Sequence, residues 1–174
     1  MPNLVINFLL FQTSWFALVA GAANNLLIPG AALCALFFAW ELYRSKARKR
    51  LVALVVVAVA GGIIVDGSYA LFGLVEYQLP AGPIAPWWII GLWVIFALTL
   101  TESMGWMRDR IWAGALMAGI GAPLSYLAGY KLGAIEFPLG LATGLGIAAL
   151  TWIPAIYVLV LICNRLMPQP EPKA

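Results

Sequence analysis

One acidic residue inside an otherwise apolar stretch is the first candidate for chemistry. Asp66 lies 15 residues after Leu51, which is about 22 Å along an α-helix. That depth is past the middle of a hydrocarbon core about 30 Å thick, where an aspartate costs about 2.5 to 3.5 kcal/mol. We therefore expect Asp66 to face other helices or a cavity, as a proton-handling or substrate-binding group. A structural role stays open, in which the carboxyl group caps a helix or bonds to a Tyr, Gln or Asn.

The residues at helical spacing from Asp66 form a face suited to a pocket. Gly62, Asp66, Tyr69 and Gly73 are separated by four, three and four residues, so a helix places them on one stripe. The two glycines allow another helix to approach closely. Tyr69 can bond to the carboxyl group or line the same pocket, and Gln12 from the first apolar stretch is predicted to add a polar group.

The fifth apolar stretch supplies the two remaining predicted ligand-binding residues, Ser125 and Tyr126. Pro123 interrupts the backbone hydrogen bonds of this stretch and predicts a kink. Small residues recur along it at helical spacing, which predicts close contact with another helix. This stripe consists of Ala118, Ala122, Ser125 and Gly129.

Glu102 is the second candidate acid or base. It lies one helical turn before Trp106, a residue typical of the membrane interface, so we expect Glu102 near the cytoplasmic surface. An ion pair with Arg108 or Arg110 is its structural alternative. Because Asp66 is expected to lie deeper, a paired-carboxylate site of the glycosidase type, with carboxyl groups within about 10 Å, is not indicated.

Other polar residues in the apolar stretches favour structural roles. Asn3, Asn7 and Ser14 share one side of the first stretch, where buried amides usually form hydrogen bonds between helices. Glu41 precedes Arg44 by three residues, the spacing of an ion pair on a helix.

The composition limits both the chemistry and the class of protein. Of 174 residues, 64% are hydrophobic and 10% are charged, against roughly 25% charged in a soluble domain, so lipid is the expected solvent. The chain has no histidine, which excludes imidazole-ligated haem, histidine-based triads and most zinc sites. We predict no metal or cofactor, and Cys34 and Cys163 are interpreted as small buried hydrophobic residues.

Six stretches are long and apolar enough to span a bilayer, which requires about 20 residues each. Lipid allows only helices or a closed barrel, and continuous apolar runs exclude the barrel. We therefore predict an all-α membrane protein, a bundle of six transmembrane helices formed by residues 1–167, with a Pro/Gly loop at 78–86 and a disordered cytoplasmic tail at 168–174. The predicted helices cover residues 3–22, 26–43, 51–75, 86–107, 111–130 and 138–163.

The basic residues predict the orientation of this bundle. Nine of the ten fall on one side if the stretches alternate, and only Lys131 falls on the other, so the positive-inside rule places both termini in the cytoplasm. The five in loop 44–50 are also expected to bind anionic lipid head groups, at about 1 kcal/mol each; nucleic acid is not a predicted partner. These five are Arg44, Lys46, Arg48, Lys49 and Arg50.

The first stretch has an alternative interpretation as a signal peptide. It ends in small residues, Ala20-Gly21-Ala22, but no lysine or arginine precedes its apolar run. Signal peptides normally carry such a charge, so a retained helix is favoured.

Three segments together resemble a known family. They read NFLLFQTSWFALVAGA, PWWIIGLWVIFALTLTESMGWM and GAPLSYLAGYKLGA, and they are similar to an uncharacterised family of bacterial inner-membrane proteins whose function is unknown. The resemblance covers most of the chain and implies a small multi-pass protein of the Gram-negative cytoplasmic membrane, with no reaction to carry over. The matching positions are Asn7, Gln12, Trp15, Trp93, Glu102, Ser103, Pro123, Ser125, Tyr126 and Gly129.

Three functional hypotheses remain open. In the first, the protein binds or acts on a lipid or other apolar ligand, with Asp66, Tyr69 and Gln12 at the polar end of an intramembrane pocket. In the second, it is a proton-coupled carrier of a small solute with Asp66 as the titrating site. In the third, it is a non-catalytic subunit whose small-residue faces bind another membrane protein or a second copy of the chain.

Overall fold

Seven helices, six of them long, make up nearly all of the structure in residues 2–79 and 85–167, which the computed structural model describes. A single pair of two-residue strands joins two loops. The helices are α1 (Pro2–Ala23), α2 (Ile28–Arg44), α3 (Arg48–Leu71), α4 (Trp87–Thr99), α5 (Trp106–Asp109), α6 (Ile111–Leu132) and α7 (Leu141–Leu166), and the strands are β1 (Glu76–Tyr77) and β2 (Ile135–Glu136). The predicted tail 168–174 and residues 80–84 of the predicted Pro/Gly loop lie outside the described residues.

The helical class predicted from the composition agrees with the structure. By length and composition, α1, α3, α6 and α7 are each able to cross a membrane, which fits a small integral membrane protein. The boundaries of α1, α2, α6 and α7 agree with the predicted stretches to within three residues.

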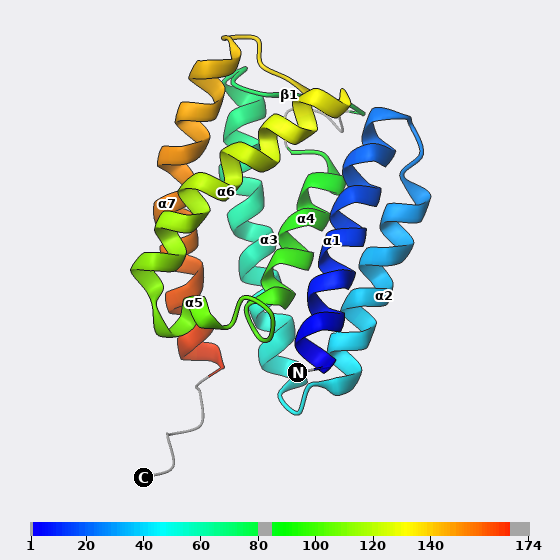
Figure 1. The fold of residues 1–174 in the computed structure, drawn as a ribbon, viewed down its shortest axis with the longest axis vertical. Helices are drawn as coiled ribbons and strands as arrows, with labels where there is room; N and C mark the ends of the chain where they lie inside the picture. The colour runs from blue at the N-terminus through cyan, green and yellow to red at the C-terminus, as the bar shows by residue number, and fades with distance from the viewer. Residues whose placement is uncertain (1, 80–84, 168–174) are drawn as a thin grey trace.

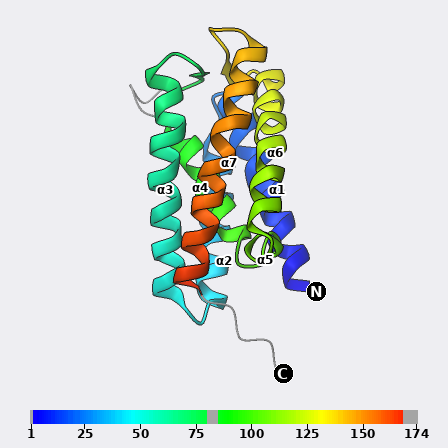
Figure 2. The same ribbon diagram turned by 90° about the vertical axis from the view of Figure 1, so that its left-hand side faces the viewer.

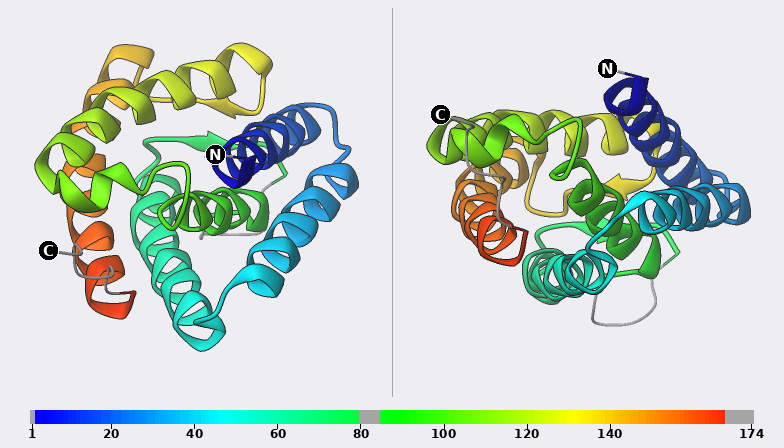
Figure 3. Two further views of the ribbon diagram at one scale, coloured as in Figure 1. Left: turned by 60° about the horizontal axis from the view of Figure 1, so that its bottom comes forward. Right: turned by 90° about the horizontal axis from the view of Figure 1, so that it is seen from below.

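The helix α4 occupies the centre of the bundle. Figure 3 shows it enclosed by the other long helices, and it packs against α1, α2 and α3. Of its 13 residues only Trp87 is exposed. A helix that is apolar all round is suited to this position because no face of it needs water.

The predicted span 86–107 is wrong in extent, because α4 ends at Thr99. At about 1.5 Å per residue its 13 residues cover about 20 Å. Hydroxyl groups at the end bond to the backbone of the preceding turn, Thr99 to the carbonyl of Phe96 (2.6 Å) and Thr101 to that of Leu98 (3.0 Å). Such local bonds compete with helix continuation, and the chain turns before α5.

The predicted span 51–75 is also corrected at both ends. The helix α3 begins at Arg48 and ends at Leu71, followed by Gly73 with a φ of 63°. That left-handed conformation is typical of a glycine just beyond a helix. Gly73 therefore does not continue the stripe of Asp66.

Only residues 45–47 separate α2 from α3, so the basic segment 44–50 is largely helical. The guanidinium of Arg48 donates to the carbonyls of Leu42 (3.0 Å) and Tyr43 (3.2 Å) at the end of α2. Carbonyl groups in the last turn of a helix lack partners within the helix and attract cations. The bonds from Arg48 therefore stabilise the tight turn between α2 and α3.

The connections gather at two ends of the bundle. Figure 1 shows the start of α1, the α2–α3 turn, α5 and the end of α7 at one end, and the α1–α2 turn, β1 and the α6–α7 connection at the other. Figure 2 shows α3 and α7 side by side along their length, in agreement with their packing. The described basic residues other than Lys131 belong to elements at the first end.

Candidate functional site

A cavity of about 540 Å³ lies among α1, α4 and α6, with α7 contributing to its wall. Its lining is mostly apolar and rich in aromatic rings. Aromatic side chains from all four helices take part, namely Phe11, Trp15, Trp88, Trp93, Phe96, Tyr126 and Trp152. Cavities of about 300 to 1,000 Å³ with apolar walls and few polar groups are typical of sites for small ligands.

Asp66 contributes the acidic group of the cavity wall and is only 1% exposed. Its Oδ1 accepts hydrogen bonds from the hydroxyl of Tyr77 (2.8 Å) and from that of Tyr126, and its Oδ2 accepts one from Nε1 of Trp93 (2.7 Å). All three donors are neutral side chains. Among the described residues, no lysine or arginine lines the cavity.

Tyr77 reaches Asp66 because a short strand pair holds it over the end of α3. Residue Tyr77 of β1 pairs with Ile135 of β2, and the amide of Gln78 donates to the carbonyl of Ala134 (2.9 Å). Burial raises the pKa of the Tyr77 phenol well above its ordinary range, and the nearby carboxylate of Asp66 raises it further. The phenol therefore remains a neutral donor at physiological pH.

Trp93 reaches Asp66 because Gly62 leaves room for its indole ring. A Cβ atom at Gly62 would lie 2.5 Å from Cδ1 of Trp93, and the indole is stacked on Trp152 with ring centroids 4.7 Å apart. The indole is thus held between α3 and α7 with its N–H directed at the carboxyl group. The predicted close approach at Gly62 is made by this side chain.

We predict that Gly62→Ala lowers the free energy of unfolding by about 1 to 3 kcal/mol, since the added methyl group displaces the Trp93 ring. The measurement is reversible unfolding in mixed micelles, followed by circular dichroism. Gly61→Ala is the matched control, because its Cβ would lie 3.5 Å from the same ring, an ordinary contact. Equal stability of the two variants would contradict the prediction.

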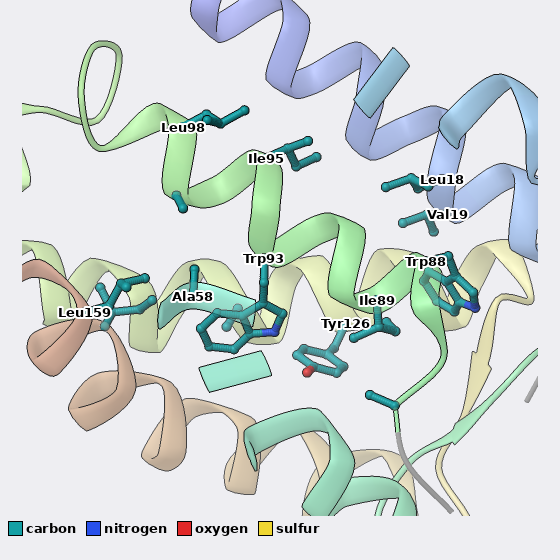
Figure 4. Packing of buried hydrophobic residues seen from close by; sticks show 14 of the residues in the cluster. Leu18, Val19, Ala58, Trp88, Ile89, Trp93, Ile95, Leu98, Tyr126 and Leu159 are labelled. Carbon is teal, nitrogen blue, oxygen red and sulfur yellow. The ribbon is translucent and has the colours of Figure 1, made fainter. Parts of the chain in front are cut away.

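Tyr126 completes an aromatic cluster around the carboxyl group. Its ring meets Tyr69 edge-on with centroids 5.9 Å apart and Trp152 edge-on at 6.3 Å. In Figure 4 the side chains of Trp93 and Tyr126 point from α4 and α6 into the same space. Edge-to-face and stacked contacts of this kind stabilise aromatic clusters beyond their buried area.

The small-residue stripe of α6 lines the cavity. Ala118, Ala122, Ser125 and Gly129 are all lining residues, although the spacing predicted that they would support close helix contact. A small side chain has the same physical effect in a helix contact and in a cavity wall, since it leaves space that either a neighbouring helix or a ligand can fill. Here α6 packs mainly against α7, and its stripe borders the cavity.

We infer that the cavity reaches the lateral surface of the bundle beside α1 and α6. Its lining includes exposed residues of both helices: Gln12, Met117 and Leu124. Deeper in, the indole N–H of Trp15 donates to Oγ of Ser125 (3.0 Å) and joins the two helices. An opening on an apolar lateral surface faces the bilayer when the helices span a membrane.

Four of the five predicted ligand-binding residues line this one cavity: Gln12, Asp66, Ser125 and Tyr126. Tyr69 lies behind it, where its hydroxyl forms a hydrogen bond with that of Thr151. The predicted role of these residues in binding is not tested by their positions and stays a prediction. The sequence does not indicate that the three donors to Asp66 act as a set, because they lie in β1, α4 and α6 and meet only in the folded chain.

Glu102 lies in a different network, near the end of the bundle where α2 ends. Its carboxylate pairs with Arg44 (3.1 Å), and the predicted partner Arg108 instead donates to Asn164 (2.9 Å). The expected pairing with Arg108 or Arg110 is therefore wrong. The partner comes from α2, a helix 58 residues earlier in the chain, which sequence spacing does not reveal.

A buried polar cluster adjoins this ion pair and joins α1, α2 and the turn after α4. Nδ2 of Asn7 donates to Oε1 of Glu41 (3.0 Å) and to the carbonyl of Leu98 (3.2 Å), while its Oδ1 accepts from Oγ of Ser103 (2.5 Å). Arg44 approaches Glu41 to 3.5 Å, as their spacing predicted. Asn7 is fully buried and Glu41 is 4% exposed, so the cluster is a structural connection.

No metal site is apparent in the part of the chain that the structure describes, where no three His, Cys, Asp or Glu side chains are grouped to hold an ion.

The comparisons with curated proteins and with solved structures found no match. Residues 4–158 match the model of a protein family, DUF2878, whose description is a protein of unknown function. The chain therefore belongs to this family, as the resemblance of its three segments indicated.

Proposed function

We propose that this protein binds a lipid or another apolar ligand in the cavity that contains Asp66. The observation that carries the proposal is an apolar cavity of about 540 Å³ that has one buried carboxyl group in its wall and exposed residues of α1 and α6 in its lining. The apolar walls suit an alkyl chain, and the carboxyl group suits a polar end. A ligand already dissolved in the bilayer reaches a cavity on the lateral surface without crossing water.

The bonding of Asp66 supports an anchoring role over acid–base chemistry. Three donors hold its two oxygen atoms in place, and the described residues place no second carboxyl group in the cavity lining. Glu102 belongs to the separate network with Arg44. We therefore propose a binding protein, with Asp66, Tyr126, Ser125 and Gln12 as its polar contacts and Tyr69 supporting Tyr126.

We further propose that the bundle of six long helices is embedded in a bacterial cytoplasmic membrane with both termini in the cytoplasm, and that the short α4 lies within the bundle, enclosed by longer helices. The basic residues supply the support, since the described ones other than Lys131 belong to one end of the bundle. At that end Lys46, Lys49 and Arg50 are exposed and take part in none of the side-chain bonds among the described residues. We propose that these three contact anionic head groups, while Arg44 and Arg48 bind within the protein.

The orientation predicts opposite labelling of two single cysteines in a chain whose Cys34 and Cys163 are replaced by alanine. Lys46→Cys lies in the α2–α3 turn and Leu139→Cys in the α6–α7 connection, and both positions are exposed. In sealed right-side-out vesicles, a membrane-impermeant maleimide is expected to label Leu139→Cys at once and Lys46→Cys only after the vesicles are permeabilised. Prompt labelling of Lys46→Cys in sealed vesicles would contradict the proposed orientation and indicate the opposite one.

Occupancy of the cavity is tested by filling it. Gly121 lines the cavity, and a Cβ atom there meets nothing within 4 Å, so Gly121→Leu is expected to fold and to place its side chain at the opening. We expect the leucine side chain to exclude part of the ligand and to weaken its binding about tenfold, which corresponds to about 1.4 kcal/mol of binding free energy. The measurement is the lipid-bound fraction of gently solubilised protein in native mass spectrometry.

Gly146→Leu is the matched control for this experiment. Gly146 is also helical, and a Cβ atom there also meets nothing within 4 Å, but it does not line the cavity. Its bound lipid is expected to equal that of the unmodified protein. If Gly121→Leu retains the same lipid at the same occupancy, the ligand lies elsewhere and the proposal fails.

A further inference from the structure

We infer that the ligand of this cavity carries a cationic head, such as an alkylammonium group, that binds Asp66 and the aromatic rings beside it. The inference rests on the proposed function and names the class of ligand. Its basis is the lack of a counterion for Asp66 and the arrangement of the aromatic rings that line the cavity beside it.

The carboxyl group of Asp66 has no counterion within the described residues. Its donors are two phenols and an indole, and no described lysine or arginine lines the cavity. A carboxylate within a low-dielectric interior is costly unless a positive charge accompanies it. A ligand that brings a cation supplies that charge, whereas a phosphate or carboxylate head would add a second negative charge.

The carboxyl group also retains the capacity to bind such a head. Oδ1 accepts two hydrogen bonds, but Oδ2 accepts one, from Trp93. A carboxylate offers about four acceptor positions in total. One acceptor position on Oδ2 is therefore without a donor among the described residues, and we infer that an ammonium N–H group occupies it.

The aromatic rings beside Asp66 favour the same kind of head. Trp93, Trp152 and Tyr126 all line the cavity, and each is in ring contact with at least one of the other two. Cations are attracted to the faces of Trp and Tyr rings, and surrounding rings with a carboxylate are a recurrent means of recognising organic ammonium groups. This attraction adds to that of the carboxylate, and it does not act on a neutral hydroxyl head.

The test uses three photoreactive amphiphiles that share one diazirine-bearing dodecyl chain: an amine, an alcohol and a carboxylate. The full-length protein is reconstituted in phosphatidylcholine vesicles, which carry no net charge, and cross-linked sites are mapped by peptide mass spectrometry. All three probes are expected to label the facing segments of α1 and α6. Half-maximal labelling by the amine is expected at a concentration about tenfold lower than by the alcohol, and the carboxylate is expected to require more than either.

Asp66→Asn removes the charge with little change of size, and it is expected to abolish the preference for the amine over the alcohol. Glu102→Gln is the matched control, since it removes a carboxylate that pairs with Arg44 and is expected to leave the preference unchanged. If Asp66→Asn does not fold, the comparison of the three probes on the unmodified protein still decides the matter.

The outcomes separate this inference from the proposal on which it rests. Equal labelling of the cavity by all three probes, or stronger labelling by the alcohol or the carboxylate, would overturn the cationic head and leave a general apolar site. Labelling of the cavity by none of the three would overturn the binding function itself, and with it the inference. A preference for the amine that persists in Asp66→Asn would also overturn the assigned role of the carboxyl group.

Discussion

Replacing Asp66 by leucine is expected to lower the free energy of unfolding by about 3 kcal/mol, because three buried donors lose their acceptor and each lost bond costs about 1 kcal/mol or more. The donors come from β1, α4 and α6, so the carboxyl group joins parts of the chain up to 60 residues apart. The measurement is reversible unfolding in mixed sodium dodecyl sulfate and mild detergent micelles, followed by circular dichroism.

A double variant separates lost hydrogen bonds from altered packing. Tyr77→Phe in the Asp66→Leu background removes one donor that has no acceptor, so part of the lost stability is expected to return. In the unmodified background the same Tyr77→Phe change is expected to destabilise by about 1 kcal/mol. If the two effects of Tyr77→Phe are equal, the hydroxyl of Tyr77 does not depend on Asp66 and the described bond is not formed.

Replacing Asn7 by leucine is expected to destabilise the protein by about 2 to 4 kcal/mol. The change removes four hydrogen bonds between α1 and the groups of Glu41, Leu98 and Ser103. It leaves the buried carboxylate of Glu41 with Arg44 at 3.5 Å, and buried polar groups without partners cost about 1 to 3 kcal/mol each. The same unfolding assay measures the effect.

Thr13→Val is the control for the same helix. Thr13 is exposed, and its hydroxyl bonds only to carbonyls of its own helix, Leu9 (2.8 Å) and Leu10 (3.2 Å). We expect this variant to change stability by less than about 0.5 kcal/mol. A loss as large as that of Asn7→Leu would mean that any polar change in α1 is disruptive and that the cluster around Asn7 has no special part in stability.

Several local features were predictable because they depend on neighbours in the chain. The apolar stretches correctly located α1, α2, α6 and α7, since burial of the backbone in lipid requires helices. The ion pair of Glu41 and Arg44 followed from a spacing of three residues on α2. The end of α4 was missed because Thr99 and Thr101 are compatible with an apolar run, yet their hydroxyls bond to preceding carbonyls.

The candidate site was predictable only in part. The cost of a carboxyl group in lipid indicated that Asp66 faces inward, and it is 1% exposed. The spacing of small residues on α6 indicated a face with free space, but it did not reveal whether a helix or a cavity would occupy that space. The hydrogen bond from Tyr77 to Asp66 could not be predicted, because Tyr77 is positioned by its strand pairing with Ile135, which lies 58 residues later in the chain.

The hydropathy of contiguous residues is enough to specify the helical membrane class, the approximate helix boundaries and the need for Asp66 to avoid lipid. Tertiary structure alone decided that Gln12, Asp66, Ser125 and Tyr126 line one cavity and that Glu102 pairs with Arg44. The physical reason is that lipid specifies which residues enter a bundle, whereas the order and rotation of the helices depend on contacts between distant side chains. The position of Trp93 between Gly62 and Trp152 is one such contact.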